Sequence, residues 1–281
     1  MLEEGIYLSV FIALSWSLSG IIVKWFSSKH GNAIAALAIA LGNLMIIGAA
    51  AAVIGNFSIS ANNIMFSLLA GITNGIGYML FFFSLSRQQA SNTYATIEIQ
   101  VALIVAYSVA FLGERLSALA VAGGVLILFG ILAVSVEKKK FNKALVPAIA
   151  ANVFWALGWI LLINPISSTK NVLLPIWISF TAAAAIILVA MLRSTSSHKS
   201  ARKVTAKDAL GGLSAGLLSG LGNALYGVVI VIKELAIGTL LSNGSPAIIA
   251  ILAHFIYHDK LTKPQVIGII AIVVGGLLIG I

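Results

Sequence analysis

The chain has 281 residues, of which 60% are hydrophobic and 9% are charged, and its mean hydropathy is +1.08. A soluble globular protein carries about 25% charged residues, so this composition excludes a soluble enzyme, a disordered protein and a nucleic-acid-binding protein. The net charge of +9 comes from 17 Lys and Arg against 8 Asp and Glu. In so apolar a chain, this excess predicts basic loops on one side of a membrane. The composition indicates a polytopic membrane protein.

The N-terminus, Met1-Leu2-Glu3-Glu4, is acidic, whereas a cleavable signal peptide begins with basic residues. We therefore expect the first apolar segment to be retained as a membrane span. The chain contains no cysteine, which excludes disulfides and thiolate metal sites.

Ten apolar segments follow one another along the chain. Each is long enough for a tilted helix, because a spanning helix needs about 20 mainly apolar residues. Strands of a transmembrane barrel would alternate polar and apolar residues, and no segment does so. We therefore expect an all-α polytopic membrane protein with ten transmembrane helices. The predicted spans are residues 5–26, 32–54, 63–86, 93–112, 118–136, 144–164, 171–192, 209–232, 237–257 and 264–281.

The chain repeats itself at a separation of 145 residues. Residues 70–77 are similar to residues 215–222, and residues 113–117 are similar to residues 258–262. Near the start of each half, the sequence around Trp16 is echoed around Trp155 at a slightly shorter separation. Agreement of this length in one register predicts an internal duplication.

Each half of the chain, residues 1–140 and residues 141–281, therefore holds five spans. Because five spans reverse the direction of the chain, the second repeat must lie inverted relative to the first. Two inverted five-helix repeats around a site in the middle of the membrane are the plan of many secondary transporters. This plan predicts transport by alternating access.

Glycines and one proline are predicted to shape the packing of the helices. Gly71 and Gly75 in the third span, and Gly216 and Gly220 in the eighth, have the spacing that lets helices approach closely. We predict a packing role for these glycines, with hinge motion as the alternative. Pro246 frees a backbone carbonyl one turn before it, which predicts a break in the ninth span beside the cavity.

Glu98 is the first candidate for a functional side chain. An ionisable group within a span costs several kcal/mol, so we expect Glu98 to face the interior of the bundle. There it would bind a substrate cation or take up a coupling proton. The alternative is a structural role near the positive end of its helix, paired with Lys24 or Arg87. In the 145-residue repeat, the position equivalent to Glu98 is Asn243.

Aromatic and amide side chains in the middle of spans are the other candidates. Trp16, Trp155 and Trp159 lie away from the interfacial belt where tryptophan gathers, and in a cavity they would stack on a ring, a sugar or a cation. Amides and phenols in the third and eighth spans predict a polar site for a zwitterion or polyol, with interhelical hydrogen bonding as the alternative. The predicted substrate-binding residues are Trp16, Asn43, Asn74, Tyr78, Glu98, Trp155, Asn223, Tyr226, Asn243 and Ser245.

The sequence contains no GxxxxGK[ST] loop to hold phosphates, so we do not expect ATP-driven pumping. We also expect no metal and no cofactor, because His254 and His258 stand near a helix end without a third ligand. An intramembrane enzyme, with Glu98 as a lone base, and a structural membrane subunit are the alternatives from other classes. The polar groups repeated in two related spans argue against both.

Several motifs resemble those of the drug/metabolite transporter superfamily, in particular its EamA-type members. Trp16 followed by Lys24 is similar to the family's opening pattern, and Phe-Leu-Gly-Glu-Arg-Leu at residues 111–116 is similar to the turn after its fourth span. The chain departs from the family in having Val101 where a proline is usual, and Asp259 in place of a glutamate. The resemblance implies a carrier of amino acids, sugars, choline, nucleotide sugars or sugar phosphates.

We therefore expect a secondary transporter of the plasma membrane that moves a small polar metabolite, an amino acid or a related compound. The resemblance alone favours export. A sugar or polyol uptake carrier and a cationic-drug exporter are the alternatives. The expected partners are the small-molecule substrate, the lipid bilayer and coupling protons, with no nucleic acid, and the protein is expected to work as a monomer or homodimer.

Two arguments about orientation disagree. Loops after odd-numbered spans hold 14 of the 17 Lys and Arg residues, and loops after even-numbered spans hold only Arg115, Lys170 and Lys233. By the positive-inside rule, the basic loops face the cytoplasm and both termini lie outside. Members of the superfamily generally have cytoplasmic termini. We give the charge count slightly more weight because it is a property of this chain.

Overall fold

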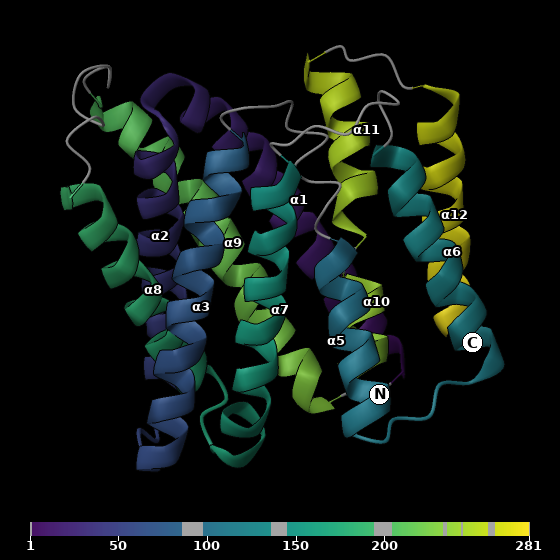
Figure 1. The fold of residues 1–281 in the computed structure, drawn as a ribbon, viewed down its shortest axis with the longest axis horizontal. Helices are drawn as coiled ribbons and strands as arrows, with labels where there is room; N and C mark the ends of the chain where they lie inside the picture. The colour runs from purple at the N-terminus through teal and green to yellow at the C-terminus, as the bar shows by residue number, and fades with distance from the viewer. Residues whose placement is uncertain are drawn as a thin grey trace.

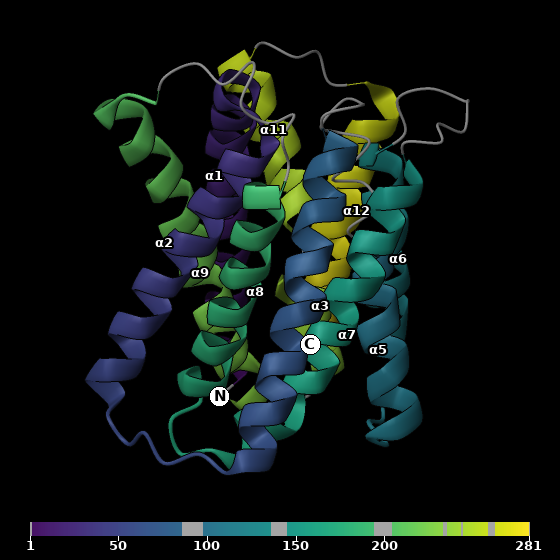
Figure 2. The same cartoon turned by 60° about the vertical axis from the view of Figure 1, so that its left-hand side comes forward.

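The computed structural model describes residues 2–85, 98–135, 145–193, 204–232, 235–242, 244–257 and 262–280. Every regular element in these ranges is an α-helix, and the helices run alongside one another in a single bundle (Figure 1). A second view shows the same arrangement from the side (Figure 2). The marked ends of the chain lie at the same end of the bundle (Figure 1).

The helices follow each other up and down through the bundle. In the first half of the chain they are α1 (Leu2–His30), α2 (Asn32–Ile54), α3 (Ala61–Leu85), α5 (Glu98–Phe111) and α6 (Ala118–Ser135). In the second half they are α7 (Leu145–Ser168), α8 (Leu173–Arg193), α9 (Ala206–Ile232), α10 (Leu235–Ser242), α11 (Ser245–Tyr257) and α12 (Lys263–Gly280).

Seven stretches of the described chain are long and apolar enough to cross a membrane, and α10 and α11 together make one of them. Three shorter apolar helices accompany them, at Ile99–Phe111, Ala118–Gly130 and Val266–Leu278. These elements coincide with the ten apolar segments of the sequence. Helices suit a bilayer because they satisfy their own backbone hydrogen bonds. The prediction of an all-helical polytopic membrane protein is confirmed.

The ninth predicted span consists of two helices instead of one. α10 ends at Ser242, and α11 begins at Ser245, so the expected break is present. The break precedes Pro246, which is the second residue of α11. A proline at that place costs no hydrogen bond, because the first N–H groups of a helix have no partner within it.

The two ends of the bundle need names. We call the end where α1 begins and α12 ends the termini side, and the opposite end, where α1 and α8 end with Lys29 and Arg193 in their last turns, the basic side. On the termini side, Gly55 closes α2 with a φ of 68°, a conformation that glycine adopts easily. The Asn171 side chain donates to the carbonyls of Ala51 and Gly55, at 2.8 and 2.7 Å, and so ties the end of α2 to the turn before α8.

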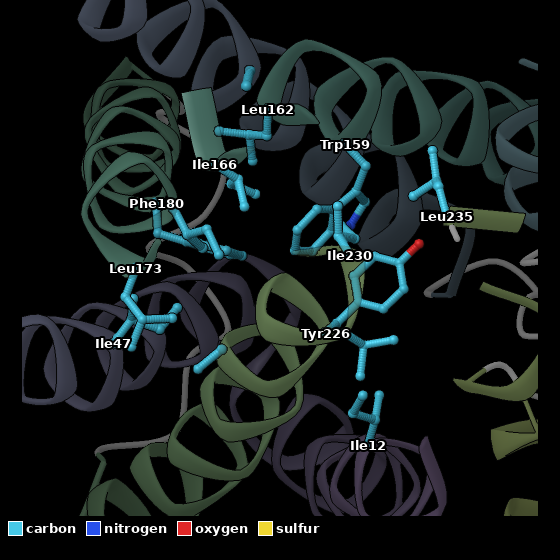
Figure 3. Close-up of a cluster of buried hydrophobic side chains, with 14 of the residues drawn as sticks. Ile12, Ile47, Trp159, Leu162, Ile166, Leu173, Phe180, Tyr226, Ile230 and Leu235 are labelled. Carbon is cyan, nitrogen blue, oxygen red and sulfur yellow. The ribbon is translucent and has the colours of Figure 1, made fainter. Parts of the chain in front are cut away.

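Buried side chains form separate clusters toward the two sides. The cluster on the termini side joins α1, α2, α3, α5, α7, α8, α9 and α10, and Figure 3 shows its side chains converging between the helices. Its members include Ile12, Leu162, Ile176, Val229 and Leu235. A second cluster, which contains Phe26, Phe81 and Ala215, lies toward the basic side. The interior between these clusters holds the candidate site.

Candidate functional site

A cavity of about 140 Å³ lies in the middle of the bundle, between helices of both halves of the chain. Its wall combines aromatic rings with neutral polar groups. None of the lining residues within the described ranges carries a formal charge. The aromatic lining residues are Trp16, Tyr78, Phe81, Phe82, Trp155, Trp159 and Phe180. The polar lining residues are Ser19, Asn74, Gln100, Ser219, Asn223 and Ser245.

The structure brings most of the predicted substrate-binding residues together at this cavity. Asn43 and Tyr226 lie close by but are not among the lining residues. The side chain of Glu98 and the whole of Asn243 lie outside the described residues. Glu98 is nevertheless the first residue of α5, two positions before a lining residue, Gln100. The predicted residues that line the cavity are Trp16, Asn74, Tyr78, Trp155, Asn223 and Ser245.

Hydrogen bonds between helices fix the amide side chains at the cavity. Asn223 of α9 donates to the Asn43 side-chain oxygen at 2.7 Å. Asn74 of α3 donates to the Ser179 hydroxyl of α8 at 3.2 Å. The Tyr78 hydroxyl also interacts with the side chains of Ser219 and Asn223. The amides therefore hold helices together and also offer polar atoms to the cavity wall, which combines the two alternatives raised by the sequence.

Tyr226 forms a layer beneath the cavity on the termini side. Its side chain is 1% exposed, and its ring packs edge-on against Trp159 at a centroid distance of 4.6 Å (Figure 3). The Trp16 ring lies 5.7 Å from the same tyrosine. The Tyr226 hydroxyl and the Thr239 hydroxyl of α10 are 2.6 Å apart. Tyr226 thus supports the floor that Trp159 presents to the cavity.

The cavity extends toward the basic side and ends at this floor. Along α1 the lining runs from Trp16 to Val23, about two turns toward the basic side. Beneath the floor, Ile12 and Leu162 are fully buried. The cavity therefore lies entirely on the basic side of the floor.

Two tryptophans rest on glycines of the neighbouring helix. A Cβ atom at Gly222 would lie 2.5 Å from Nε1 of Trp16, and one at Gly77 would lie 2.6 Å from Nε1 of Trp155. Only a glycine leaves room for the indole in either place. We did not predict Gly77 and Gly222 as site residues, although both belong to the repeated segments. Trp159 was considered in the sequence, but its role as the floor depends on Tyr226.

The glycines predicted to pack helices lie where α3 meets α8 and where α9 meets α2. A Cβ at Gly71 would clash with the backbone of Ser179, and one at Gly216 would clash with the backbone of Gly42. Gly75 and Gly220 make similarly close approaches to the same two helices. A hinge role for these glycines stays a prediction.

Comparisons with known proteins identify a family and a shared fold. The model of the EamA-like transporter family matches residues 4–136 and again residues 142–281. A solved structure described as "Crystal structure of protein" superimposes with a TM-score of 0.73, covering 98% of this chain and 96% of the other at 18% sequence identity. A search of curated proteins found no match. The structural likeness shows a shared fold, and the family match covers nearly the whole chain.

Proposed function

Because the chain belongs to the EamA-like transporter family, a branch of the drug/metabolite transporter superfamily of membrane proteins, we propose that it is a secondary transporter working by alternating access. Its cargo would be a small polar metabolite, with an amino acid or related compound as the leading class. Export across the plasma membrane is the favoured direction. The single observation that carries this proposal is a central cavity between the two halves of the chain, closed on one side by a packed floor.

Helix packing supports two inverted repeats, residues 1–140 and residues 141–281. α1 packs against α9, and its counterpart α7 packs against α3. α2 packs against α9, and its counterpart α8 packs against α3. Each helix contact in this pair therefore has an equivalent contact when the two halves are interchanged. A pseudo-twofold axis between inverted repeats requires this.

The contact between α6 and α12 supports the same axis at the level of single atoms. A Cβ at Gly130 would lie 2.5 Å from the carbonyl oxygen of Gly268, and one at Gly275 would lie 2.5 Å from that of Gly123. Gly130 and Gly275 are 145 residues apart, as are Gly123 and Gly268. Two repeats related in this way could exchange conformations and open the cavity to either side.

The chemistry of the lining supports a neutral or zwitterionic metabolite with an apolar part. Amides such as Asn74 and Asn223 can donate to and accept from polar groups, while Trp16 and Trp155 offer flat apolar surfaces. The same rings also attract organic cations, so a cationic-drug exporter is the second candidate. A sugar or polyol carrier would use the amides and the ring faces together.

A screen for ligands tests the substrate class. A ligand that binds only the folded state raises the melting temperature as its concentration rises above its Kd. We expect an amino acid or related compound to stabilise the detergent-purified protein, and the Asn74→Ala variant to lose most of that shift. Stabilisation by quaternary amines that persists in Asn74→Ala would instead support the cation exporter.

Orientation, proton coupling and oligomeric state belong to the same proposal. The charge bias places the basic side in the cytoplasm, which would put the cavity on the cytoplasmic side of the floor. A C-terminal reporter that is active only on the outer face would support this orientation, and one active in the cytoplasm would reverse it. Glu98 is the proposed proton carrier, and a monomer or homodimer is the proposed working unit.

A further inference from the structure

Glu114, in the turn between α5 and α6, caps the N-terminus of α10. Its Oε1 accepts a hydrogen bond from the backbone N–H of Leu235 at 2.7 Å, and its Oε2 accepts one from the N–H of Ala236 at 2.9 Å. The first N–H groups of a helix have no partner within it, and a negative charge there is favourable. The contact joins a turn of the first half of the chain to a helix of the second half.

α10 is the element that covers the cavity floor on the termini side. Its Thr239 hydroxyl bonds to the Tyr226 hydroxyl, directly beneath Trp159. Gly238 of α10 lies against the Val229 side chain of α9, close enough that a Cβ on the glycine would meet it at 2.6 Å. Continuous contacts therefore connect the cavity floor, through α10, to the carboxylate of Glu114.

The cap lies where the two halves must separate if the cavity is to open toward the termini side. α10 is eight residues long, and most of it is buried against its neighbours. α10 packs against α1 and α5 of the first half as well as against α9. For Tyr226 and Val229 to become accessible from the termini side, α10 must move away from all three. Such a move carries the N–H groups of Leu235 and Ala236 away from a carboxylate that belongs to the other half.

We propose that Glu114 is a positioning residue that sets which side the cavity opens to. Its two hydrogen bonds hold α10 over the floor and so favour the conformation that is closed on the termini side. The inference rests on the proposed alternating-access function. An interaction present in only one of two conformations shifts their populations by the whole of its free energy. Release of cargo on the termini side then requires both bonds to break.

Substitutions at Glu114 should shift the populations in graded steps. Glu114→Gln keeps one good acceptor for the two N–H groups, and Glu114→Ala keeps none. Loss of a helix cap changes an equilibrium by roughly 2- to 30-fold, so we expect accessibility from the termini side to rise about 3-fold in Glu114→Gln and about 10-fold in Glu114→Ala. Arg115→Gln is the matched control. Arg115 is exposed in the same turn, and its substitution by glutamine also changes the net charge by one.

The chain has no cysteine, so single cysteines can report on each side without other changes. Val229→Cys places a thiol beneath the floor, where the side chain is 0% exposed. Ile249→Cys places one in the cavity wall, above the floor. Both reporters would be reconstituted in liposomes and labelled with a membrane-impermeant maleimide, with and without each substitution at Glu114.

The proposal predicts faster labelling at Val229→Cys in both Glu114 variants, with labelling at Ile249→Cys unchanged or slower and no effect of Arg115→Gln. Faster labelling at both reporters would show that Glu114 only stabilises the bundle, and would overturn the proposal. Unchanged labelling at both would also overturn it.

A separate measurement tests alternating access itself. With Glu114 intact, a ligand found in the screen must change the labelling rates at Val229→Cys and Ile249→Cys in opposite directions. If it does not, alternating access itself fails, whatever Glu114 does.

Discussion

Asp208 of α9 and Asn63 of α3 are 145 residues apart in the sequence and hold equivalent joints at opposite ends of the bundle. On the termini side, Asn63 donates to the Ser168 hydroxyl at the end of α7, at 3.0 Å. On the basic side, Asp208 accepts from Lys29 at the end of α1, at 2.5 Å, and lies 3.2 Å from Nε2 of His30. The equivalent contacts between helices are thus neutral on the termini side and charged on the basic side.

The charged joint predicts a stability that depends on salt. We expect Asp208→Asn to lower the melting temperature, because it removes a charged hydrogen bond, although the partly exposed lysine keeps the effect modest. Thermal unfolding in detergent would measure this, at low and high salt. The difference from wild type should shrink at high salt because ions screen the pair.

Asn63→Ala is the control for this experiment, since it weakens the equivalent neutral joint. Its destabilisation should not depend on salt. Equal salt dependence of the two variants would contradict the assignment of an ion pair to Asp208.

The glycines beneath the two tryptophans predict weaker cargo binding by a protein that still folds. In Gly77→Ala and Gly222→Ala, the new methyl group would push the indole of Trp155 or Trp16 out of its place. We expect a rise of about tenfold in the KM for the cargo, together with a shift in tryptophan fluorescence, since repacking an occupied site usually costs about 1–3 kcal/mol.

Gly276→Ala is the matched control, because a Cβ at Gly276 would have no neighbour within 4 Å. It should leave the KM and the fluorescence unchanged. If Gly77→Ala and Gly222→Ala behave like Gly276→Ala, the tryptophans are free to move, and their present places do not shape the site.

The pair formed by Asn43 and Asn223 separates binding from packing. Both substitutions to alanine break the 2.7 Å hydrogen bond between α2 and α9, so each should reduce stability by about 0.6–2 kcal/mol. Only Asn223 lines the cavity. We therefore expect Asn223→Ala to lose ligand stabilisation in the thermal-shift assay, and Asn43→Ala to keep it. Loss in both variants would place Asn43 in the site.

The sequence was sufficient for the helical membrane fold because long apolar segments and short polar separators leave few other arrangements. It also predicted six of the seventeen residues that line the cavity, because amides and tryptophans in the middle of a span favour an interior position. Asn74, Tyr78 and Asn223 were found in this way. The family resemblance, carried by Trp16, Lys24 and the turn at residues 111–116, is confirmed by the family match.

The sequence could not show on which side the cavity lies. In the register that pairs Trp16 with Trp155, Trp159 is paired with Gly20, and Tyr226 is paired with Phe81 at 145 residues. The termini side therefore has two rings packed edge-on, where the basic side has a glycine and a single ring. Both Gly20 and Phe81 line the cavity. That Trp159 and Tyr226 pack against each other to form one floor is seen only in the structure.

Tyr226 illustrates the same limit. Its phenol made it a candidate for the cavity, but the hydroxyl is satisfied by Thr239 of α10 and the ring lies under Trp159. This partner comes from α10, the short helix that precedes the break before α11. Pro246 predicted the break in this segment, but not that the half before it would supply the partner of Tyr226.

Proton coupling through Glu98 predicts a selective defect. Glu98→Gln removes the ionisable group while keeping its size, so flux driven by a proton gradient should be abolished, and exchange of labelled for unlabelled cargo should continue. Transport into liposomes with and without an imposed pH gradient would distinguish the two. Loss of both activities would indicate a binding role, and loss of neither would remove Glu98 from the mechanism.

Counterflow in liposomes tests the central claim most directly. Liposomes containing the purified protein would be loaded with an unlabelled compound that stabilises it, and then diluted into a trace of the labelled form. A carrier that alternates between two sides must accumulate the label transiently, and only in preloaded liposomes. Uptake no greater than in protein-free liposomes, for a compound that the protein demonstrably binds, would contradict the account.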